Sequence, residues 1–114
     1  MVLSHGLESG PQATKVGALA AVAEAQGWRT LRPDYRDLDA QGLAAATSPR
    51  LARLRAAVPA HAPCVLVGSS FGAFISGLVS CEVPVRGLVF AGHAAADFPV
   101  TRRPSPCARV VPVC

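Results

Sequence analysis

The chain has 114 residues, of which 51% are hydrophobic and 16% charged, so it can bury a core but has room for a single small domain. Its net charge of +4 arises mainly from three arginines in the last 17 residues, since residues 1–97 are nearly balanced. Because no basic stretch is interleaved with aromatic residues, we expect no nucleic-acid partner. No apolar run reaches about 18 residues, so we expect no membrane span.

The beginning of the chain and its cysteines bear on the compartment. The first six residues lack the basic start and long apolar region of a secretory signal, so a cytoplasmic location is expected. Cys64, Cys81, Cys107 and Cys114 have no metal-ligand spacing, which favours free thiols and no metal. The first apolar run is not followed by G-x-G-x-x-G, so a nucleotide cofactor is not expected either, and we expect no cofactor of any kind.

The chain alternates between short apolar runs, which predict strands, and stretches with helical periodicity. Strands are predicted at residues 2–4, 28–32, 64–67 and 86–91, and helices at 15–26, 48–58 and 71–79. Residues 34–46 read as a polar loop with room for a helical turn. This alternation predicts a three-layer α/β/α fold around a short parallel sheet of about four strands. Right-handed crossovers favour the strand order 2-1-3-4, with a switch point for ligand binding between the first and third strands.

The third predicted strand runs directly into the pattern G-x-S-x-G, formed by residues 68–72. A strand, a tight turn centred on serine and a helix together make a nucleophile elbow, in which Ser70 would be the exposed nucleophile. Gly68 and Gly72 are explained by the sharpness of the turn, because side chains there would strike the neighbouring strand and helix. The simpler interpretation is a Gly/Ser-rich turn without chemistry.

Attack by a serine hydroxyl on a carbonyl places negative charge on oxygen, and N–H donors must stabilise it. The N–H of Phe71, directly after the predicted nucleophile, would be one donor. The loop after the first strand should supply the other, and the N–H of Leu7 is the best candidate. Gly6 would let the backbone approach closely.

Two motifs in this order resemble those of the α/β-hydrolase superfamily. They are Val2-Leu3-Ser4-His5-Gly6 and, about 60 residues later, the run from Val67 to Ala73. The resemblance extends over residues 1–92, taken as a partial α/β-hydrolase core domain, and is strongest to small bacterial esterase-like members. It implies hydrolysis of an ester, thioester or amide of a small-molecule acyl substrate through an acyl-serine intermediate. It also implies that His5 shapes the oxyanion loop.

The general base is harder to place, because the family carries its acid and then its histidine after the elbow. Besides His5 the chain offers His61, at the wrong end of the elbow strand, and His93, which follows the fourth strand. His93 is the candidate base, although it precedes Asp97 and so departs from the family's order. A catalytically silent α/β domain that uses the same crevice for binding or assembly therefore stays open as the alternative.

Residues 93–114 change character, with no apolar period and with an Arg/Pro/Ala/Cys-rich end. We expect an irregular or disordered tail that packs against nothing, and a truncated or frame-shifted relative of an active hydrolase is one explanation. The strands at 28–32 and 86–91 would then be open edges of the sheet. Open edges favour pairing with a second copy, so a homo-oligomer is expected.

Overall fold

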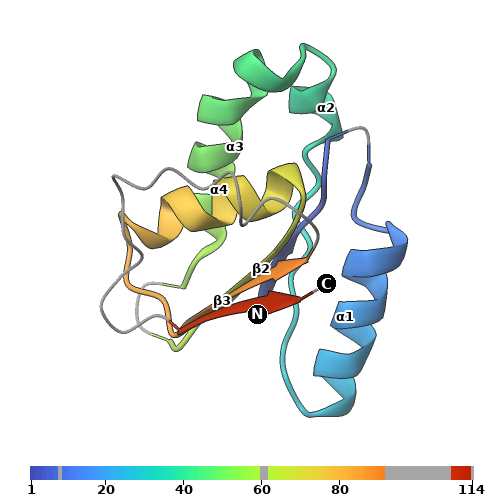
Figure 1. Ribbon diagram of the computed structural model, residues 1–114, viewed down its shortest axis with the longest axis vertical. Helices are drawn as coiled ribbons and strands as arrows, with labels where there is room; N and C mark the ends of the chain where they lie inside the picture. Colours follow the sequence, from blue (N-terminus) through green and yellow to red (C-terminus); the bar gives the residue numbers. More distant parts are fainter. Residues whose placement is uncertain (8, 60–61, 92–108, 114) are drawn as a thin grey trace.

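The computed structural model describes residues 1–7, 9–59, 62–91 and 109–113. Four parallel strands form one sheet in the order β1-β2-β3-β4 (Figure 1). The strands are β1 (Val2–Ser4), β2 (Val65–Ser69), β3 (Gly87–Ala91) and β4 (Arg109–Val113). The helices are α1 (Thr14–Ala25), α2 (Arg36–Asp39), α3 (Leu43–Ala57) and α4 (Phe71–Ser80).

The helices lie on both faces of this sheet, as the alternating pattern predicts. Helix α1 packs against β1 and β2 on one face, whereas α4 covers the other face and α3 packs beside α4 (Figure 1). The fold is therefore the predicted three-layer α/β/α arrangement around a short parallel sheet. Since α4 follows β2 directly, the start of α4 lies at the carboxyl end of the parallel strands.

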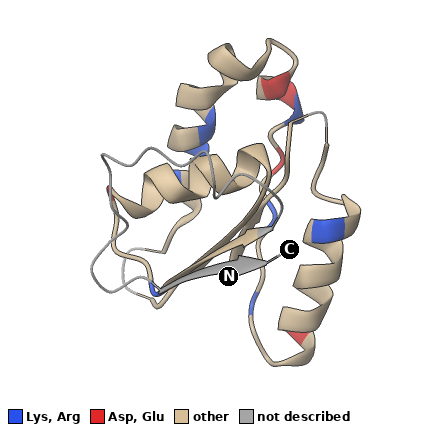
Figure 2. Cartoon of the chain, in the orientation of Figure 1, with Lys and Arg blue, Asp and Glu red and all other residues tan. Residues whose placement is uncertain are grey.

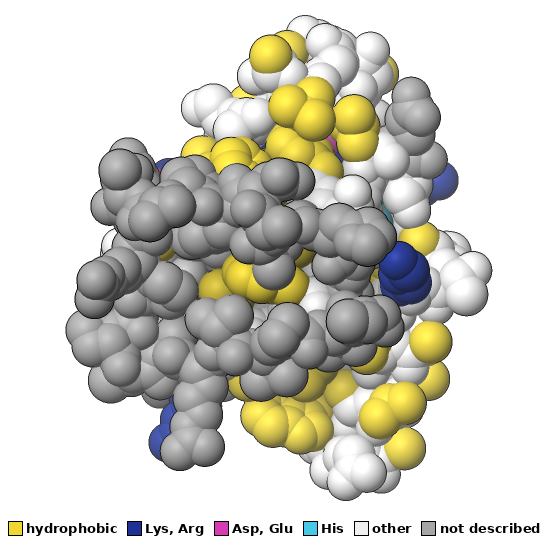
Figure 3. Space-filling view, viewed as in Figure 1, with side chains coloured by type: hydrophobic (Ala, Val, Ile, Leu, Met, Phe, Trp, Pro, Cys, Tyr) yellow, Lys and Arg dark blue, Asp and Glu magenta, His cyan; other side chains and the backbone are white. Residues whose placement is uncertain are grey.

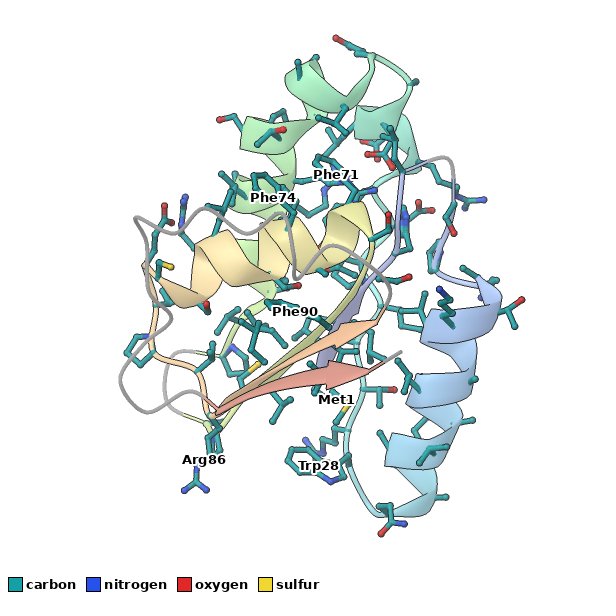
Figure 4. The ribbon with its side chains drawn as sticks, viewed as in Figure 1. Met1, Trp28, Phe71, Phe74, Arg86 and Phe90 are labelled. Carbon is teal, nitrogen blue, oxygen red and sulfur yellow. The ribbon has the colours of Figure 1, made fainter. Side chains whose placement is uncertain are left out.

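Two hydrophobic clusters, one on each face of the sheet, form the core. Successive residues of a strand point to opposite faces. The face toward α4 carries Val2, Leu66, Leu88 and Phe90, and the face toward α1 carries Leu3, Val67 and the partly buried Val89. Figure 4 shows Phe90 between the sheet and α4. β1, β2 and β3 therefore each contribute to both clusters, which explains why these strands are almost continuously apolar.

The second predicted strand, residues 28–32, is reduced to a single bridge. Leu31 pairs with Val2 of β1 in parallel, the N–H of Leu3 donates to the carbonyl of Leu31 at 2.8 Å, and the N–H of Leu31 donates to Met1 at 2.9 Å. This segment lies beside β1 as the order 2-1-3-4 requires. It is short because β1 has only three residues and so offers few backbone groups to a neighbour.

Residues 109–113 differ from the predicted irregular tail. They form β4, which pairs with β3 in register from Gly87↔Arg109 to Ala91↔Val113. Three valines favour an extended backbone here. Pro112 cannot donate a ladder hydrogen bond, which suits a strand at the edge of a sheet. The edge predicted at residues 86–91 is therefore covered by β4. The rest of the tail, including 93–108, lies outside the described residues.

Helix α3 begins five residues before the predicted start at Ser48. Gly42 precedes it with φ 93°, and Pro49 lies inside it. The prediction is wrong because Ser-Pro reads as a helix start, whereas alanines at positions 44–46 are strong helix formers that extend the helix backward. The hydroxyl of Thr47 donates to the carbonyl of Leu43 at 2.9 Å within this added turn.

Charged side chains concentrate where α2 meets α3. Figure 2 shows acidic residues on α2 close to basic ones, while the described strands β1 to β3 are almost free of charge. Arg53 pairs with Asp37 at 2.6 Å across the two helices, and Asp39 pairs with Arg50.

The longest described helix has 15 residues, and none in the described chain has the length and apolar character needed to cross a bilayer.

Several large apolar side chains remain at the surface. Val22, Trp28 and Leu31 are 61%, 42% and 51% exposed. Figure 3 shows hydrophobic side chains along α1, and Figure 4 places Trp28 near Met1 at the end of the same region.

Cys64 is buried, and burial raises the pKa of its thiol, as expected of a small apolar residue of the core. Self-association stays a prediction.

Candidate active site

Ser70 is the single residue between the end of β2 and the start of α4. Ser70 is exposed to solvent, and its backbone has φ 54° and ψ −116°. Among the described residues, no other non-glycine residue has a positive φ. A conformation of this kind costs about 1–3 kcal/mol and persists only where the surrounding structure holds it. The turn therefore places the serine hydroxyl at the carboxyl edge of the sheet, where the G-x-S-x-G pattern predicts it.

The two glycines of the motif are required by close backbone contacts. A Cβ atom at Gly68 would lie 2.4 Å from the backbone of Ala73, at the start of α4. A Cβ atom at Gly72 would lie 2.1 Å from the carbonyl oxygen of Ser4 in β1. The steric conflict predicted at both positions is present, and it shows that α4 lies directly on β1 and β2.

The loop after β1 lies against Ser70. Ser4 is in register with Gly68, so the chain after Ser4 reaches the same edge as the elbow. A Cβ atom at Gly6 would be only 3.4 Å from both the carbonyl oxygen of Ser69 and the Cβ atom of Ser70. The N–H of Phe71 is the first of α4, a position that has no acceptor within the helix. Gly6, the residue before Leu7, therefore lies against Ser70, and Phe71 follows Ser70 directly in the chain.

His5 is fully buried, and both its ring nitrogens are in use. Nε2 accepts the backbone N–H of Tyr35 at 2.9 Å, so the proton is on Nδ1, which donates to the carbonyl of Gly6 at 2.8 Å. Burial and, secondarily, the charge of Arg50 lower the pKa of His5, although its hydrogen bond to Gly6 opposes this. His5 is thus a neutral residue that holds the Gly6 carbonyl.

A buried charged pair that was not predicted from the sequence contacts this loop. Arg50 of α3 is fully buried, it is ion-paired with Asp39, and it donates to the carbonyls of His5 at 2.7 Å and of Gly6 at 3.2 Å. Its guanidinium also lies 4.4 Å from the ring centre of Tyr35. The Tyr35 hydroxyl is hydrogen-bonded to Ser4 at 2.9 Å, and burial raises its pKa.

One signal in the sequence could have indicated that Arg50 is buried. Residues 46, 50 and 54 recur every fourth position and so share one face of a helix. Ala46 and Leu54 are both fully buried, so the arginine between them lies on the buried face of α3. The predicted helix began at Ser48, and this truncation hid the pattern by excluding Ala46.

The predicted base has no position in the described chain. His93, its neighbour Asp97 and the less favoured His61 lie outside the described residues. Within the described part of the chain, no group of three His, Cys, Asp or Glu side chains is placed to hold a metal ion. The described half of the site is therefore a nucleophile elbow with an adjacent backbone loop.

Comparison with known proteins agrees with this geometry. No protein-family model and no curated protein matches the chain. Among solved structures, the chain is similar to a protein from Xanthomonas campestris pv. campestris assigned as a hydrolase of the α/β superfamily, with 35% identity and a TM-score of 0.75. The match covers 98% of this chain and 84% of that one, so it extends well beyond residue 92. At this identity and coverage, the chain belongs to the α/β-hydrolase superfamily.

Proposed function

We propose that this protein is a serine hydrolase that cleaves an ester, thioester or amide of a small acyl substrate. The oxygen of Ser70 attacks the acyl carbon, the alcohol, thiol or amine leaves with a proton, and water then releases the acid from the acyl-serine. The observation that carries this proposal is Ser70 itself, exposed and strained at φ 54° between β2 and α4. Membership of a hydrolase superfamily supports it.

The position of the first loop supports the same chemistry. The intermediate carries a negative oxygen, which needs donors that are already oriented before the reaction. Gly6 lies against Ser70, which supports the N–H of the next residue, Leu7, as one donor, and the N–H of Phe71 follows Ser70 directly in the chain. We assign these two groups to the oxyanion hole.

His93 is our candidate for the general base, because it follows β3 in the chain at the carboxyl end, the edge where Ser70 lies. His5 does not suit this task. Its Nε2 is occupied by the N–H of Tyr35, and its Nδ1 proton by the Gly6 carbonyl. We assign His5 to the shaping of the oxyanion loop, together with Gly6, Gly68 and Gly72.

A fluorophosphonate probe followed by mass analysis of the intact protein tests the proposal. The probe should add once to the native protein and should not add to Ser70→Ala. Hydrolysis of a p-nitrophenyl ester should fall by roughly 10³-fold or more in the same variant, because nucleophile and base act as a unit. Ser69→Ala is the matched control, since Ser69 is the neighbouring hydroxyl and still belongs to β2.

Two other results are informative. A loss of similar size in His93→Ala would identify the base. A folded protein that takes up no probe would overturn the proposal and favour the silent domain, which uses the crevice for binding or assembly.

A further inference from the structure

We infer that Arg50 is a positioning residue of the oxyanion hole, which fixes the direction of the Leu7 N–H by holding the other end of the same peptide group. The effect of Arg50 on catalysis rests on the proposed function. The structural content of the inference, that Arg50 orders one peptide, can be measured without any reaction.

The peptide that joins Gly6 and Leu7 carries both the Gly6 carbonyl and the Leu7 N–H. A trans peptide is planar, and its C=O and N–H point in opposite directions. Two buried side chains donate to the Gly6 carbonyl: Nδ1 of His5 at 2.8 Å and Nη2 of Arg50 at 3.2 Å. With its carbonyl held on the buried side, this peptide must turn its N–H the other way, and the Ser70 side of the loop is where Gly6 makes its close contact.

Arg50 also acts on the neighbouring peptide. Its Nη1 donates to the carbonyl of His5 at 2.7 Å, so one planar guanidinium holds two successive carbonyls. A loop held at two consecutive peptides has little freedom to rotate either of them. Lysine carries a single nitrogen on a flexible stem and could not span both with the same geometry.

The same guanidinium also lies against the side chain of Phe71, the residue that carries the second proposed donor. Its carbon lies 4.7 Å from the ring centre of Phe71, whose N–H is the other proposed member of the oxyanion hole. Figure 4 shows Phe71 at the first turn of α4. Arg50 therefore contacts both the peptide that carries the Leu7 N–H and the side chain of Phe71. Charge-assisted hydrogen bonds to the Gly6 carbonyl also polarise that peptide, which makes its N–H a stronger donor.

A purely structural role is the competing explanation, because Arg50 is ion-paired with Asp39 in the interior. The two roles use different contacts of one side chain. Asp39→Asn weakens the ion pair and leaves the hydrogen bonds to both carbonyls in place. Arg50→Gln removes both, and Arg50→Lys keeps the charge with a single donor group.

The first experiment measures ester hydrolysis per folded molecule in these three variants. Loss of one oxyanion donor lowers kcat by about 10²–10³-fold, so Arg50→Gln should lower kcat by up to that factor with little change in KM. Arg50→Lys should fall between Arg50→Gln and the native protein. Asp39→Asn should be less stable but should keep its kcat. Equal losses of kcat in Asp39→Asn and Arg50→Gln would overturn the inference.

The second experiment is independent of activity. Nitrogen-15 relaxation measures the order parameter of the Leu7 N–H, which should be about 0.85 in the native protein and in Asp39→Asn. In Arg50→Gln the order parameter should fall below about 0.6. If Arg50→Gln does not fold, Arg50→Lys takes its place with the same expected value. Leu88 in β3 serves as an internal reference that should not change. An unchanged Leu7 would overturn the inference. If the native protein showed no turnover dependent on Ser70, the proposed function would fail, and this measurement would still decide the role of Arg50.

Discussion

At the scale of single residues, the candidate site combines one exposed serine, the proposed nucleophile, with buried supports. Ser70 is exposed and strained, whereas His5 and Arg50 are fully buried, and both donate to the Gly6 carbonyl in the loop beside it. Strain of about 1–3 kcal/mol at one residue is sustained only by neighbours that cannot relax. The rigid groups of the site are therefore in the interior, and the reactive group stands at the surface.

The lowered pKa of His5 predicts a loss of stability in mild acid. The ordinary pKa of His5 is 6.5, and its pKa in the folded protein is lower. At pH values between the two, His5 is protonated in the unfolded chain and neutral in the folded protein. The free energy of unfolding should therefore fall as the pH drops below about 6.5, by at most about 1.4 kcal/mol per pH unit from this group. Urea unfolding at pH 7.5, 6.5 and 5.5 measures it.

The control for this prediction is His5→Gln. Glutamine can still accept the Tyr35 N–H but does not titrate, so the slope between pH 7.5 and 5.5 should be shallower than in the native protein. His61 and His93 contribute equally to both and cancel in the comparison. Asp34 and Asp37, whose pKa values are lowered by the arginines paired with them, act only in more acidic solution. Equal slopes would mean that His5 is not the neutral group described.

Residues of the elbow could be predicted from sequence, but those behind it could not. Gly68, Ser70 and Gly72 form a local pattern, because the strand, the turn and the helix are consecutive in the chain. Arg50 and Asp39 act through a tertiary contact between segments that pattern analysis treats as polar. The spacing of Arg50 with Ala46 and Leu54 indicates a buried helix face, but only the fold brings that face against the loop after β1 and against Asp39.

At the scale of elements, the active-site geometry depends on how closely α4 lies on the sheet. The Cβ positions at Gly68 and Gly72 are blocked by backbone atoms on opposite sides, the first by α4 itself and the second by β1. Backbone cannot be displaced as a flexible side chain can. The first turn of α4 is thus fixed between β1 and β2, and with it the direction of the Phe71 N–H.

This packing predicts that even one methyl group at Gly72 is destabilising. Gly72→Ala should lower the free energy of unfolding by about 1–3 kcal/mol or more, because the new Cβ meets the Ser4 carbonyl. Gly17→Ala is the matched control: Gly17 lies in α1, and its nearest neighbour would be 3.8 Å away. That variant should gain about 0.5–1 kcal/mol from the better helix propensity of alanine. Thermal melting of both variants checks the prediction, and Gly72→Ala melting with the native protein would contradict the close contact.

At the scale of the whole molecule, the layer order follows from the alternating pattern, but the extent of the sheet does not. The strands at β1, β2 and β3 are apolar runs that the sequence identifies. The segment around Leu31 sits where predicted and yet forms one bridge, and β4 arises within a stretch whose arginines and prolines gave no period. Edge strands gain their order mainly from the strand they pair with, so their own residues specify them weakly.

The pairing of β4 predicts that residues 109–114 contribute to stability. Deleting them removes the neighbour of β3 along five register positions and leaves its backbone groups exposed. A loss of only about 1 kcal/mol should lower the melting temperature by about 4 °C or more. Deleting Cys114 alone is the control, since it removes no register pair. A tail that packs against nothing would instead leave both deletions with the native melting temperature.

The parallel pairing of β1 with β2 also bears on how the molecule folds. About 60 residues separate Val2 from its partner Leu66, whereas about 20 separate Leu66 from Leu88. Closing the longer loop costs about 1 kcal/mol more in chain entropy, so the unit of β2, α4 and β3 should form first and β1 should dock afterwards. The elbow would then exist before the loop that we propose as part of the oxyanion hole, and a refolding chain would pass through a state that presents Ser70 without this loop beside it. Activity should accordingly return later than secondary structure during refolding.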